Sequence, residues 1–184
     1  VANVEESKAM LLAELKAAAA REPAPADYLV VAEAESPSAQ GGGEASFPAN
    51  KTGVRGTCLS GWNNRGHWVE YTMQVEHTGW YQIGLKYCVE GEEASRGVLV
   101  DGKAIHPDLE VATLPGTGGW SNGADQWSLV PLALPGFSDA LPVRLEKGSH
   151  VIRLVNSAGG GMNLDYVVLA PVQARLERSL VEKP

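Results

Sequence analysis

The feature that most constrains the fold is a series of short stretches in which apolar and polar residues alternate. Residues 68–75 and 81–88 each alternate over the length of a whole strand, and the turn-forming residues His77, Thr78 and Gly79 stand between them. Successive side chains of a strand point to opposite faces of a sheet, so alternation indicates one buried face. Similar stretches, separated by Gly, Pro and Asp, cover residues 28–35, 98–100, 103–105, 127–134, 143–145, 150–155 and 163–169. Short strands at this spacing predict an all-β sandwich of two antiparallel sheets.

The stretch at residues 81–88 also predicts which side chains form the core. Tyr81, Ile83, Leu85 and Tyr87 lie at every second position, so they are expected to point together into the interior. Two turns further predict hairpins, because short Gly-containing connections join antiparallel neighbours. One hairpin is expected around Asp101-Gly102, joining residues 98–100 to 103–105, and one around Glu146-Lys147-Gly148, joining residues 143–145 to 150–155.

Both ends of the chain carry helical signals outside the β-rich part. Residues 1–22 are rich in Ala, Leu, Lys and Glu, which favour helix, and Pro23 ends the stretch. Val172, Leu176 and Leu180 recur at helical spacing and predict a second, short helix. The expected organisation is a helical flank or linker over residues 1–26, a β-sandwich over residues 27–171 and a short helical tail over residues 172–184.

Composition excludes several classes of partner and cofactor. The net charge of −7 gives the chain no basic field for phosphate backbones, so no nucleic acid is expected as a partner. No run reaches the ~20 apolar residues of a membrane span, so no membrane partner is expected. Cys58 and Cys88 form no CxxC pair and have no accompanying His cluster, which argues against zinc. They are either one disulfide or two buried thiols.

A glycine run at residues 159–161 passes directly into the last apolar strand. Asn163 and Asp165 stand two residues apart at this junction, and side chains at this spacing share one side of an extended segment. Two interpretations are open. The polar pair either stabilises a turn before a core strand, or it belongs to a binding site at the end of the sandwich.

The order of several short motifs distinguishes these interpretations. The chain resembles non-catalytic carbohydrate-binding modules of families six and thirty-five over roughly residues 27–171. The motifs that carry the resemblance are Ala32-Glu33-Ala34-Glu35, Gly61-Trp62-Asn63-Asn64, residues 66–71, Gly79-Trp80-Tyr81, Val100-Asp101-Gly102, Leu114-Pro115, residues 117–120, residues 147–152 and Asn163-Leu164-Asp165-Tyr166. The resemblance implies a jelly-roll β-sandwich, a structural calcium ion and a sugar site in the loops at one end. The stretches 116–126 and 135–141 look long for these families, and the helical flanks are additions.

The resemblance implies a set of calcium ligands. In such modules two glutamates of the first strand and an aspartate of the last strand bind the ion, and these positions correspond to Glu33, Glu35 and Asp165. Backbone carbonyls from residues 51–55 would complete the shell. Calcium takes six to eight oxygen ligands, and carboxylates with carbonyls supply them. The alternative is that Glu33 and Glu35 are surface residues of an edge strand.

The resemblance also implies the sugar-binding residues, at the positions of Trp62, Trp120 and Asn163. An indole can stack on the apolar face of a pyranose, while an asparagine offers its hydroxyls both a donor and an acceptor. We therefore expect a secreted or cell-surface module that binds a polysaccharide or oligosaccharide beside an adjacent catalytic domain and has no catalytic residues of its own. The alternative is a structural or interaction domain without a working sugar site, docked onto a neighbouring domain through its helical flanks.

Overall fold

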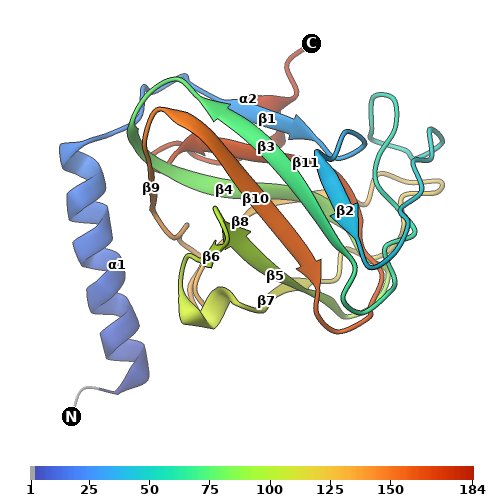
Figure 1. The fold of residues 1–184 in the computed structure, drawn as a ribbon, viewed down its shortest axis with the longest axis horizontal. Helices are drawn as coiled ribbons and strands as arrows, with labels where there is room; N and C mark the ends of the chain where they lie inside the picture. Colours follow the sequence, from blue (N-terminus) through green and yellow to red (C-terminus); the bar gives the residue numbers. More distant parts are fainter. Residues whose placement is uncertain (1–2) are drawn as a thin grey trace.

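The computed structural model describes residues 3–184 as two antiparallel sheets packed face to face (Figure 1). Sheet A has the order β1 (Val30–Glu33), β11 (Asn163–Pro171), β4 (Gly79–Cys88) and β8 (Ser128–Pro131), and β9 (Val143–Leu145) also pairs with β4. Sheet B has the order β2 (Ala39–Gly41), β3 (Trp68–Val75), β10 (Gly148–Asn156), β5 (Glu93–Val100) and β6 (Lys103–Ala104), and β7 (Ala112–Pro115) also pairs with β5. The predicted all-β jelly-roll sandwich is confirmed.

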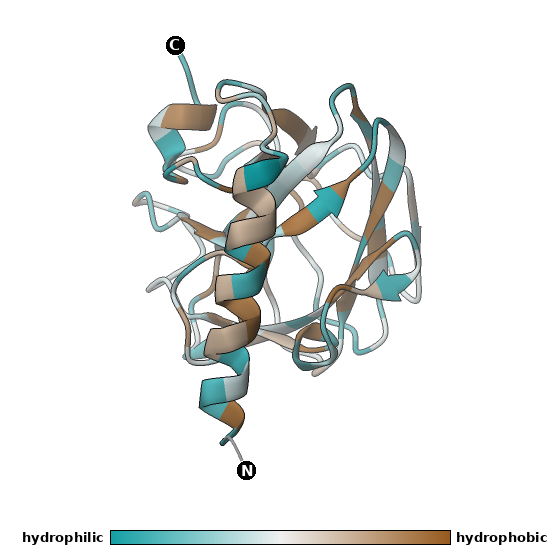
Figure 2. Cartoon of the chain, turned by 90° about the vertical axis from the view of Figure 1, so that its left-hand side faces the viewer, coloured by the Kyte–Doolittle hydropathy of each residue, from teal (hydrophilic) through white to brown (hydrophobic). Residues whose placement is uncertain are grey.

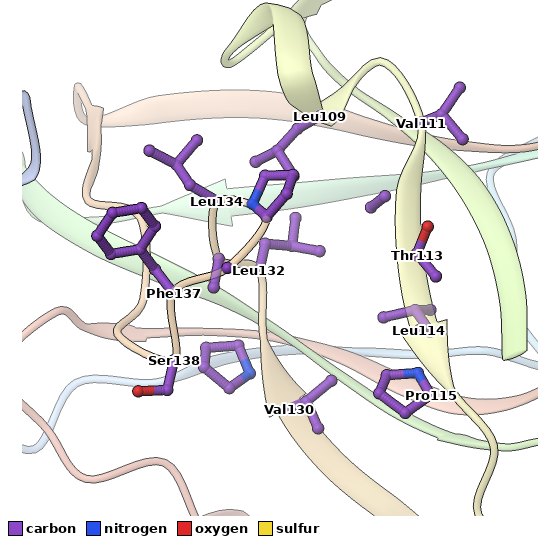
Figure 3. Close-up of a pocket in the computed structure, with 15 residues that line it drawn as sticks. Leu109, Val111, Thr113, Leu114, Pro115, Val130, Leu132, Leu134, Phe137 and Ser138 are labelled. Atoms are coloured by element: carbon purple, nitrogen blue, oxygen red, sulfur yellow. The ribbon is translucent and has the colours of Figure 1, made fainter. Parts of the chain in front are cut away.

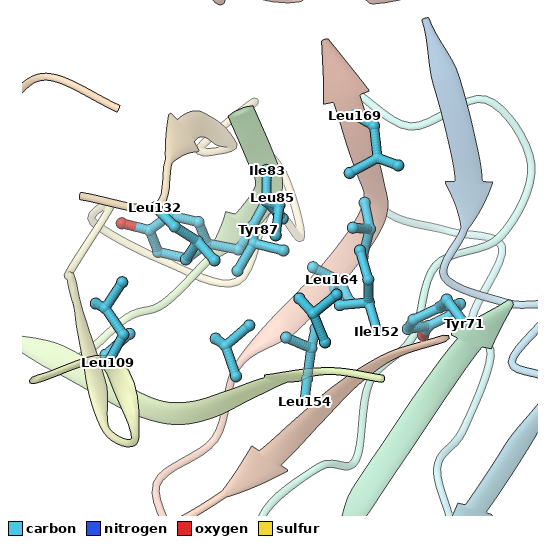
Figure 4. Packing of buried hydrophobic residues seen from close by; sticks show 14 of the residues in the cluster. Tyr71, Ile83, Leu85, Tyr87, Leu109, Leu132, Ile152, Leu154, Leu164 and Leu169 are labelled. Atoms are coloured by element: carbon cyan, nitrogen blue, oxygen red, sulfur yellow. The ribbon is translucent and has the colours of Figure 1, made fainter. Parts of the chain in front are cut away.

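The core fills the space between the two sheets (Figure 4). Tyr81, Ile83, Leu85 and Tyr87 of β4 are all buried in it, as the alternation predicted. Their neighbours in the core include Val69, Tyr71 and Met73 of β3, Ile152 and Leu154 of β10, and Leu164, Val167 and Leu169 of β11. Fully burying such side chains contributes about 1.5–3 kcal/mol each, so this layer is the main source of stability.

The outer face of β4 is buried as well, which its polar residues did not indicate. Gln82 and Lys86 are 2% and 0% exposed. The chain after β11 crosses this face and covers it. Nε2 of Gln82 donates to the carbonyls of Pro171 (3.0 Å) and Ala174 (2.7 Å), and Leu176 packs so close to Gly84 that a Cβ there would lie 2.7 Å from its Cδ2.

The hairpin predicted around residues 146–148 is wrong. β9 pairs with β4 in sheet A, whereas β10 pairs with β3 and β5 in sheet B, so the chain crosses between the sheets at this turn. A connection this short allows either geometry. Pairing with β4 places Val143 and Leu145 in the core, and that burial decides the outcome. The other predicted hairpin, β5 with β6, is present.

The N-terminal helix α1 (Val4–Arg21) agrees with the prediction for residues 1–22, of which residues 1 and 2 lie outside the described part. Asn3 caps it: its side chain accepts from the amide of Glu6 at 2.8 Å, and the Glu6 side chain accepts from the Asn3 amide. The helix lies along the side of the sandwich and shows both hydrophobic and hydrophilic bands on its outer face (Figure 2). Leu12 and Ala19 are its buried residues.

The C-terminal helix α2 (Arg178–Val181) is a single turn, shorter than the spacing of Val172, Leu176 and Leu180 indicated. Residues 172–177 form a turn and an extended segment instead. Hydrogen bonds from Gln82 to the Pro171 and Ala174 carbonyls hold the start of this segment against sheet A. The 3₁₀ turn η1 (Pro107–Leu109) completes the described elements. In residues 3–184, neither α1 nor α2 has the length and apolar character of a membrane-spanning helix.

Candidate functional site

The loops between β2 and β3 and between β7 and β8 reach the end of the sandwich away from α1 (Figure 1). Residues of these loops and the start of β11 line a pocket of about 370 Å³, which we call the loop pocket. Trp120 and Asn163, two of the residues expected to bind sugar, both line it. The other lining residues are Ser46, Lys51, Ser60, Gly61, Asn63, Asn122 and Met162. The pocket thus combines one indole with three side-chain amides, two hydroxyls and one ammonium group. Hydrogen-bonding groups around an aromatic plane are what a sugar ring requires.

Trp120 is held by a tightly folded loop. The following residue, Ser121, is fully buried and has a positive φ of 56°. Its amide donates to Oε1 of Gln126 at 3.0 Å, and its hydroxyl accepts from the Gln126 amide at 3.1 Å. A Cβ on Gly119 would lie 2.2 Å from the Gln126 carboxamide, so a larger residue there would displace the side chain that binds the Ser121 amide. The loop therefore presents Trp120 on a fixed backbone.

Asn163 joins the last strand to this loop. It is 4% exposed, and its Nδ2 donates to the Trp120 carbonyl at 3.4 Å and to Sγ of Cys88 at 3.6 Å. The two residues are 43 positions apart in the chain, and the sandwich brings them into one pocket. Asn163 therefore positions Trp120 as well as lining the pocket.

A second loop, which carries Lys51, lines the pocket and contacts the Trp120 loop. Nζ of Lys51 donates to Oδ1 of Asn122 at 2.6 Å, and the amide of Thr52 donates to the Ser121 carbonyl at 2.8 Å. Lys51 is the only charged residue among the nine that line the loop pocket. Lys51, Asn63 and Asn122 were not predicted as sugar-binding residues. Asn63 lies next to the expected Trp62, and asparagine in a glycine-containing loop is the signal that could have identified it.

Trp62 is not part of the loop pocket, and its expected role in stacking on sugar is wrong. The side chain is fully buried, with Nε1 donating to the His67 carbonyl at 3.0 Å. The guanidinium of Arg96 lies 4.1 Å from the centroid of its ring. Its neighbours Gly61 and Asn63 face the pocket, and Trp62 turns to the other side of the chain, where apolar core is available.

A buried polar network behind the pocket holds the glycine run. Nη2 of Arg96 donates to the carbonyls of Trp62 (3.1 Å) and Gly160 (3.0 Å), and Nδ2 of Asn156 donates to the same two carbonyls. Burial lowers the pKa of Arg96 to about 10, so the group stays charged at neutral pH. This network fixes residues 159–161, which lead directly into Met162 and Asn163.

The carboxylates expected to bind calcium lie where β1 ends beside β11. The amide of Ala34 donates to the Asp165 carbonyl at 2.9 Å. Glu33 and Asp165 line a cavity of about 220 Å³ together with Glu182 and other residues. Partial burial and the negative charges of Glu35 and Asp165 raise the pKa of Glu33. Oε2 of Glu35 is buried without a hydrogen-bond partner, which is the kind of oxygen that a hard cation would bind.

Lys86 already occupies part of this expected shell. Its Nζ lies 2.8 Å from Oδ2 of Asp165, 2.6 Å from Oε1 of Glu182 and 2.8 Å from the Gly53 carbonyl. In the chain from residue 3 to residue 184, no group of three or more His, Cys, Asp or Glu side chains is arranged to hold a metal ion. The Glu33 and Glu35 carboxylates therefore fit calcium in donor chemistry, whereas Asp165 is already neutralised by a lysine.

The two cysteines are free thiols in this structure. Cys58 and Cys88 are both buried and pack with Trp127. Burial raises the pKa of Cys58 to about 12 and also raises that of Cys88. Of the two interpretations drawn from the sequence, the buried-thiol arrangement is the one that the structure has.

A more apolar groove lies elsewhere on the molecule, between β7 and the segment that follows β8 (Figure 3). Its volume is about 460 Å³, and it shares no residue with the loop pocket. Thr113 and Ser138 are its only polar side chains, and no charged or amide side chain lines it. It lacks the hydrogen-bonding groups that sugar hydroxyls need, so the loop pocket is the better candidate.

Comparisons with known proteins identify the fold. No protein-family model matches the chain, and no curated protein matches it. A family 35 carbohydrate-binding module from Clostridium thermocellum aligns with a TM-score of 0.61 at 20% identity, covering 77% of this chain and 97% of that one. The C-terminal family 6 module of LamC, a laminarinase from Zobellia galactanivorans, aligns with a TM-score of 0.57 at 21% identity, covering 78% and 99%.

A similar module is also part of a larger enzyme. A mannanase from Podospora anserina that joins a glycoside hydrolase domain to a family 35 module aligns with a TM-score of 0.60 at 19% identity, covering 82% of this chain. This chain spans 29% of that protein. The chain therefore has the β-sandwich fold of family 35 and family 6 carbohydrate-binding modules, which confirms the resemblance at the level of fold.

Proposed function

We propose that this chain is a non-catalytic carbohydrate-binding module that binds a glycan in the loop pocket. The observation that carries the proposal is the convergence of Trp120 with Asn163, Asn63 and Asn122 in one pocket, on a fold shared with such modules. Trp120 offers an aromatic plane for the apolar face of a pyranose. The surrounding amides and hydroxyls offer donors and acceptors for its hydroxyl groups.

The shape of the pocket predicts weak binding. An open pocket on loops leaves much of a sugar in contact with water, so few hydroxyl groups lose their solvation. The expected dissociation constant is on the order of 10⁻⁵ to 10⁻³ M, or about −7 to −4 kcal/mol. A module of this affinity suits the retention of a linked enzyme on a polymer, where many equivalent sites are close together.

We further propose that calcium binds at the end of β1. Glu33 and Glu35 would supply carboxylate oxygens, and Asp165 would contribute beside its contact with Lys86. The buried unpaired Oε2 of Glu35 and the raised pKa of Glu33 support this proposal, because both indicate uncompensated negative charge. The ion would join the first and last strands of sheet A and so stabilise the strand that carries Asn163.

The setting we propose is a larger secreted carbohydrate-active enzyme, with the module beside a catalytic domain. The mannanase from Podospora anserina, which carries a similar module, supports this arrangement. The alternative function, a domain that docks onto a neighbouring domain, requires the helical flanks to be available as contact surfaces. Both flanks pack against the sandwich itself, through Leu12 and Ala19 of α1 and through Leu176 of the tail.

The test is titration calorimetry of the chain, with calcium present, against soluble oligosaccharides representing mannan, glucan and xylan. Trp120→Ala should abolish detectable binding, because the stacking plane is lost. Asn163→Ala should weaken binding by roughly 1–3 kcal/mol, since it removes a hydrogen-bonding group and the support of the Trp120 backbone. Trp80→Ala is the matched control, because Trp80 lies outside the loop pocket. If Trp120→Ala binds as tightly as the parent, the glycan does not bind in the loop pocket.

A further inference from the structure

We infer that Arg178 of helix α2 is a positioning residue for the loop pocket, although it lies outside it. The inference rests on the proposed function, because it concerns the residues proposed to bind the glycan. The C-terminal tail crosses the outer face of sheet A and ends beside the two loops that carry Lys51, Trp120 and Asn122. Arg178 is the tail residue whose side chain contacts both loops.

The guanidinium of Arg178 contacts each loop directly. Nη1 donates to Oδ1 of Asp125 at 2.9 Å, and Nη2 donates to Oδ2 of the same carboxylate at 3.0 Å. Nη2 also donates to the Gly53 carbonyl at 3.3 Å. Two parallel hydrogen bonds to one carboxylate fix the orientation of both groups, which a single lysine contact would not do. Asp125 and Gly53 are thereby held at a fixed separation.

The two loops already meet at the positions next to these contacts. The amide of Thr52 donates to the Ser121 carbonyl, and Nε1 of Trp127 donates to the Thr52 carbonyl, both at 2.8 Å. Gly53 has a positive φ of 87°, and a Cβ there would lie 2.5 Å from the Asp125 carboxylate. Arg178 therefore binds a junction in which the Asp125 carboxylate lies directly against the backbone of Gly53.

The network continues from the tail to the strand that carries Asn163. Nε of Arg178 donates to Oε2 of Glu182 at 2.8 Å, and Oε1 of Glu182 lies 2.6 Å from Nζ of Lys86. Lys86 in turn binds Asp165 at 2.8 Å, two residues after Asn163. The tail thus contacts the loops of Lys51 and Trp120 directly, and it reaches the strand of Asn163 through Lys86.

The ion pair between Arg178 and Asp125 is partly shielded, with side chains 33% and 39% exposed. The hydrogen bond from Arg178 lowers the pKa of Asp125, so both groups are charged at neutral pH. Without Arg178 the loops would keep their direct contacts and the hydrogen bond from Lys86 to the Gly53 carbonyl, but they would lose their shared contact with the C-terminal tail. A glycan would then have to order them on binding, which we expect to weaken its affinity about three- to tenfold.

The decisive experiment compares Arg178→Gln with Arg175→Gln. Both substitutions remove one positive charge from the same tail. The Arg175 side chain, however, is 90% exposed, and its one ion pair within residues 3–184 is with Glu177, at 3.6 Å. Hydrogen exchange of residues 50–55 and 118–127 is measured first, without glycan. Calorimetry then measures the affinity for a glycan that the parent binds. Two further variants test the role of the double hydrogen bond. Arg178→Lys keeps the charge without the double hydrogen bond and should restore little of the parent's protection and affinity. Asp125→Asn should reproduce the effect of Arg178→Gln.

Faster exchange in both segments and weaker glycan binding in Arg178→Gln, with neither change in Arg175→Gln, would support the inference. Equal exchange in the two variants would overturn it, as would faster exchange with unchanged affinity. If the parent binds no glycan, the proposed function fails. The exchange measurement would then still decide whether Arg178 positions the loops.

Discussion

Replacing Lys86 by Met should strongly destabilise this protein. The ammonium is 1% exposed and contacts two carboxylates and one backbone carbonyl at 2.6–2.8 Å. Met keeps most of the aliphatic stem and removes the charge. Asp165, whose side chain is 8% exposed, would then hold a buried charge with no counter-ion. Glu182 would be affected less, because Arg178 remains beside it.

Removing one partner of a buried ion pair typically costs about 3–5 kcal/mol. That is a large part of the roughly 5–15 kcal/mol that stabilises a typical domain. For a chain of this size, about 2–4 °C of melting temperature is lost per kcal/mol, so we expect a decrease of about 6–20 °C. Urea unfolding in the presence of a chelator gives the free energy directly and separates this effect from that of calcium.

Two further measurements identify the cause. Adding Asp165→Asn to Lys86→Met should recover part of the loss, because the unpaired charge is removed. Burial already raises the pKa of Asp165 despite the opposing effect of Lys86. In Lys86→Met the pKa should rise further, so the variant should lose stability as the pH rises through it. A cost below about 1 kcal/mol, or a double variant less stable than Lys86→Met, would refute this reasoning.

Three other predictions concern the core, the pH dependence and the proposed metal. Trp62→Phe should lower the free energy of unfolding in urea by about 1–3 kcal/mol, because it removes packing and the hydrogen bond to the His67 carbonyl. Glycan affinity should be unchanged. If the variant instead kept its full stability and bound the glycan more weakly, the indole would belong to the sugar site. Burial lowers the pKa of His150, but the Glu146 carbonyl and the Asp101 carboxylate outweigh this effect and raise the pKa above its ordinary value. The stabilisation is therefore complete below the pKa of the unfolded state and is lost as the pH rises through the folded pKa. Melting curves of His150→Gln should lack this loss, and a pH profile parallel to that of the parent would disprove the prediction. Removing calcium with a chelator should lower the melting temperature without changing the fold, since calcium at ~100 times its dissociation constant adds roughly 2.7 kcal/mol to the free energy of unfolding. Identical melting curves with and without chelator would rule out a structural ion.

The sequence by itself determined the fold class and the main strands. Alternation over residues 68–75 predicted β3 with the bounds that the structure has, and the stripe from Tyr81 to Tyr87 lies in the core as expected. Such patterns are local, because the two-residue period of a strand and the preference of apolar side chains for the interior are both visible in a short window. The sequence also predicted that Trp120 and Asn163 belong to one site. This prediction came from the order of motifs along the chain and not from a local periodicity.

Only the tertiary structure decided which segments meet. β9 and β10 lie close together in the chain but belong to different sheets. The polar face of β4 is buried because a tail about 90 residues later covers it, with Glu182 binding Lys86 across 96 positions. Trp62 points inward because the core offers room on that side, and its neighbour Asn63 faces the pocket instead. The exposure of a side chain, the pairing of a strand and the neutralisation of a buried charge all depend on groups that are far away in the chain. A local sequence pattern therefore cannot predict them.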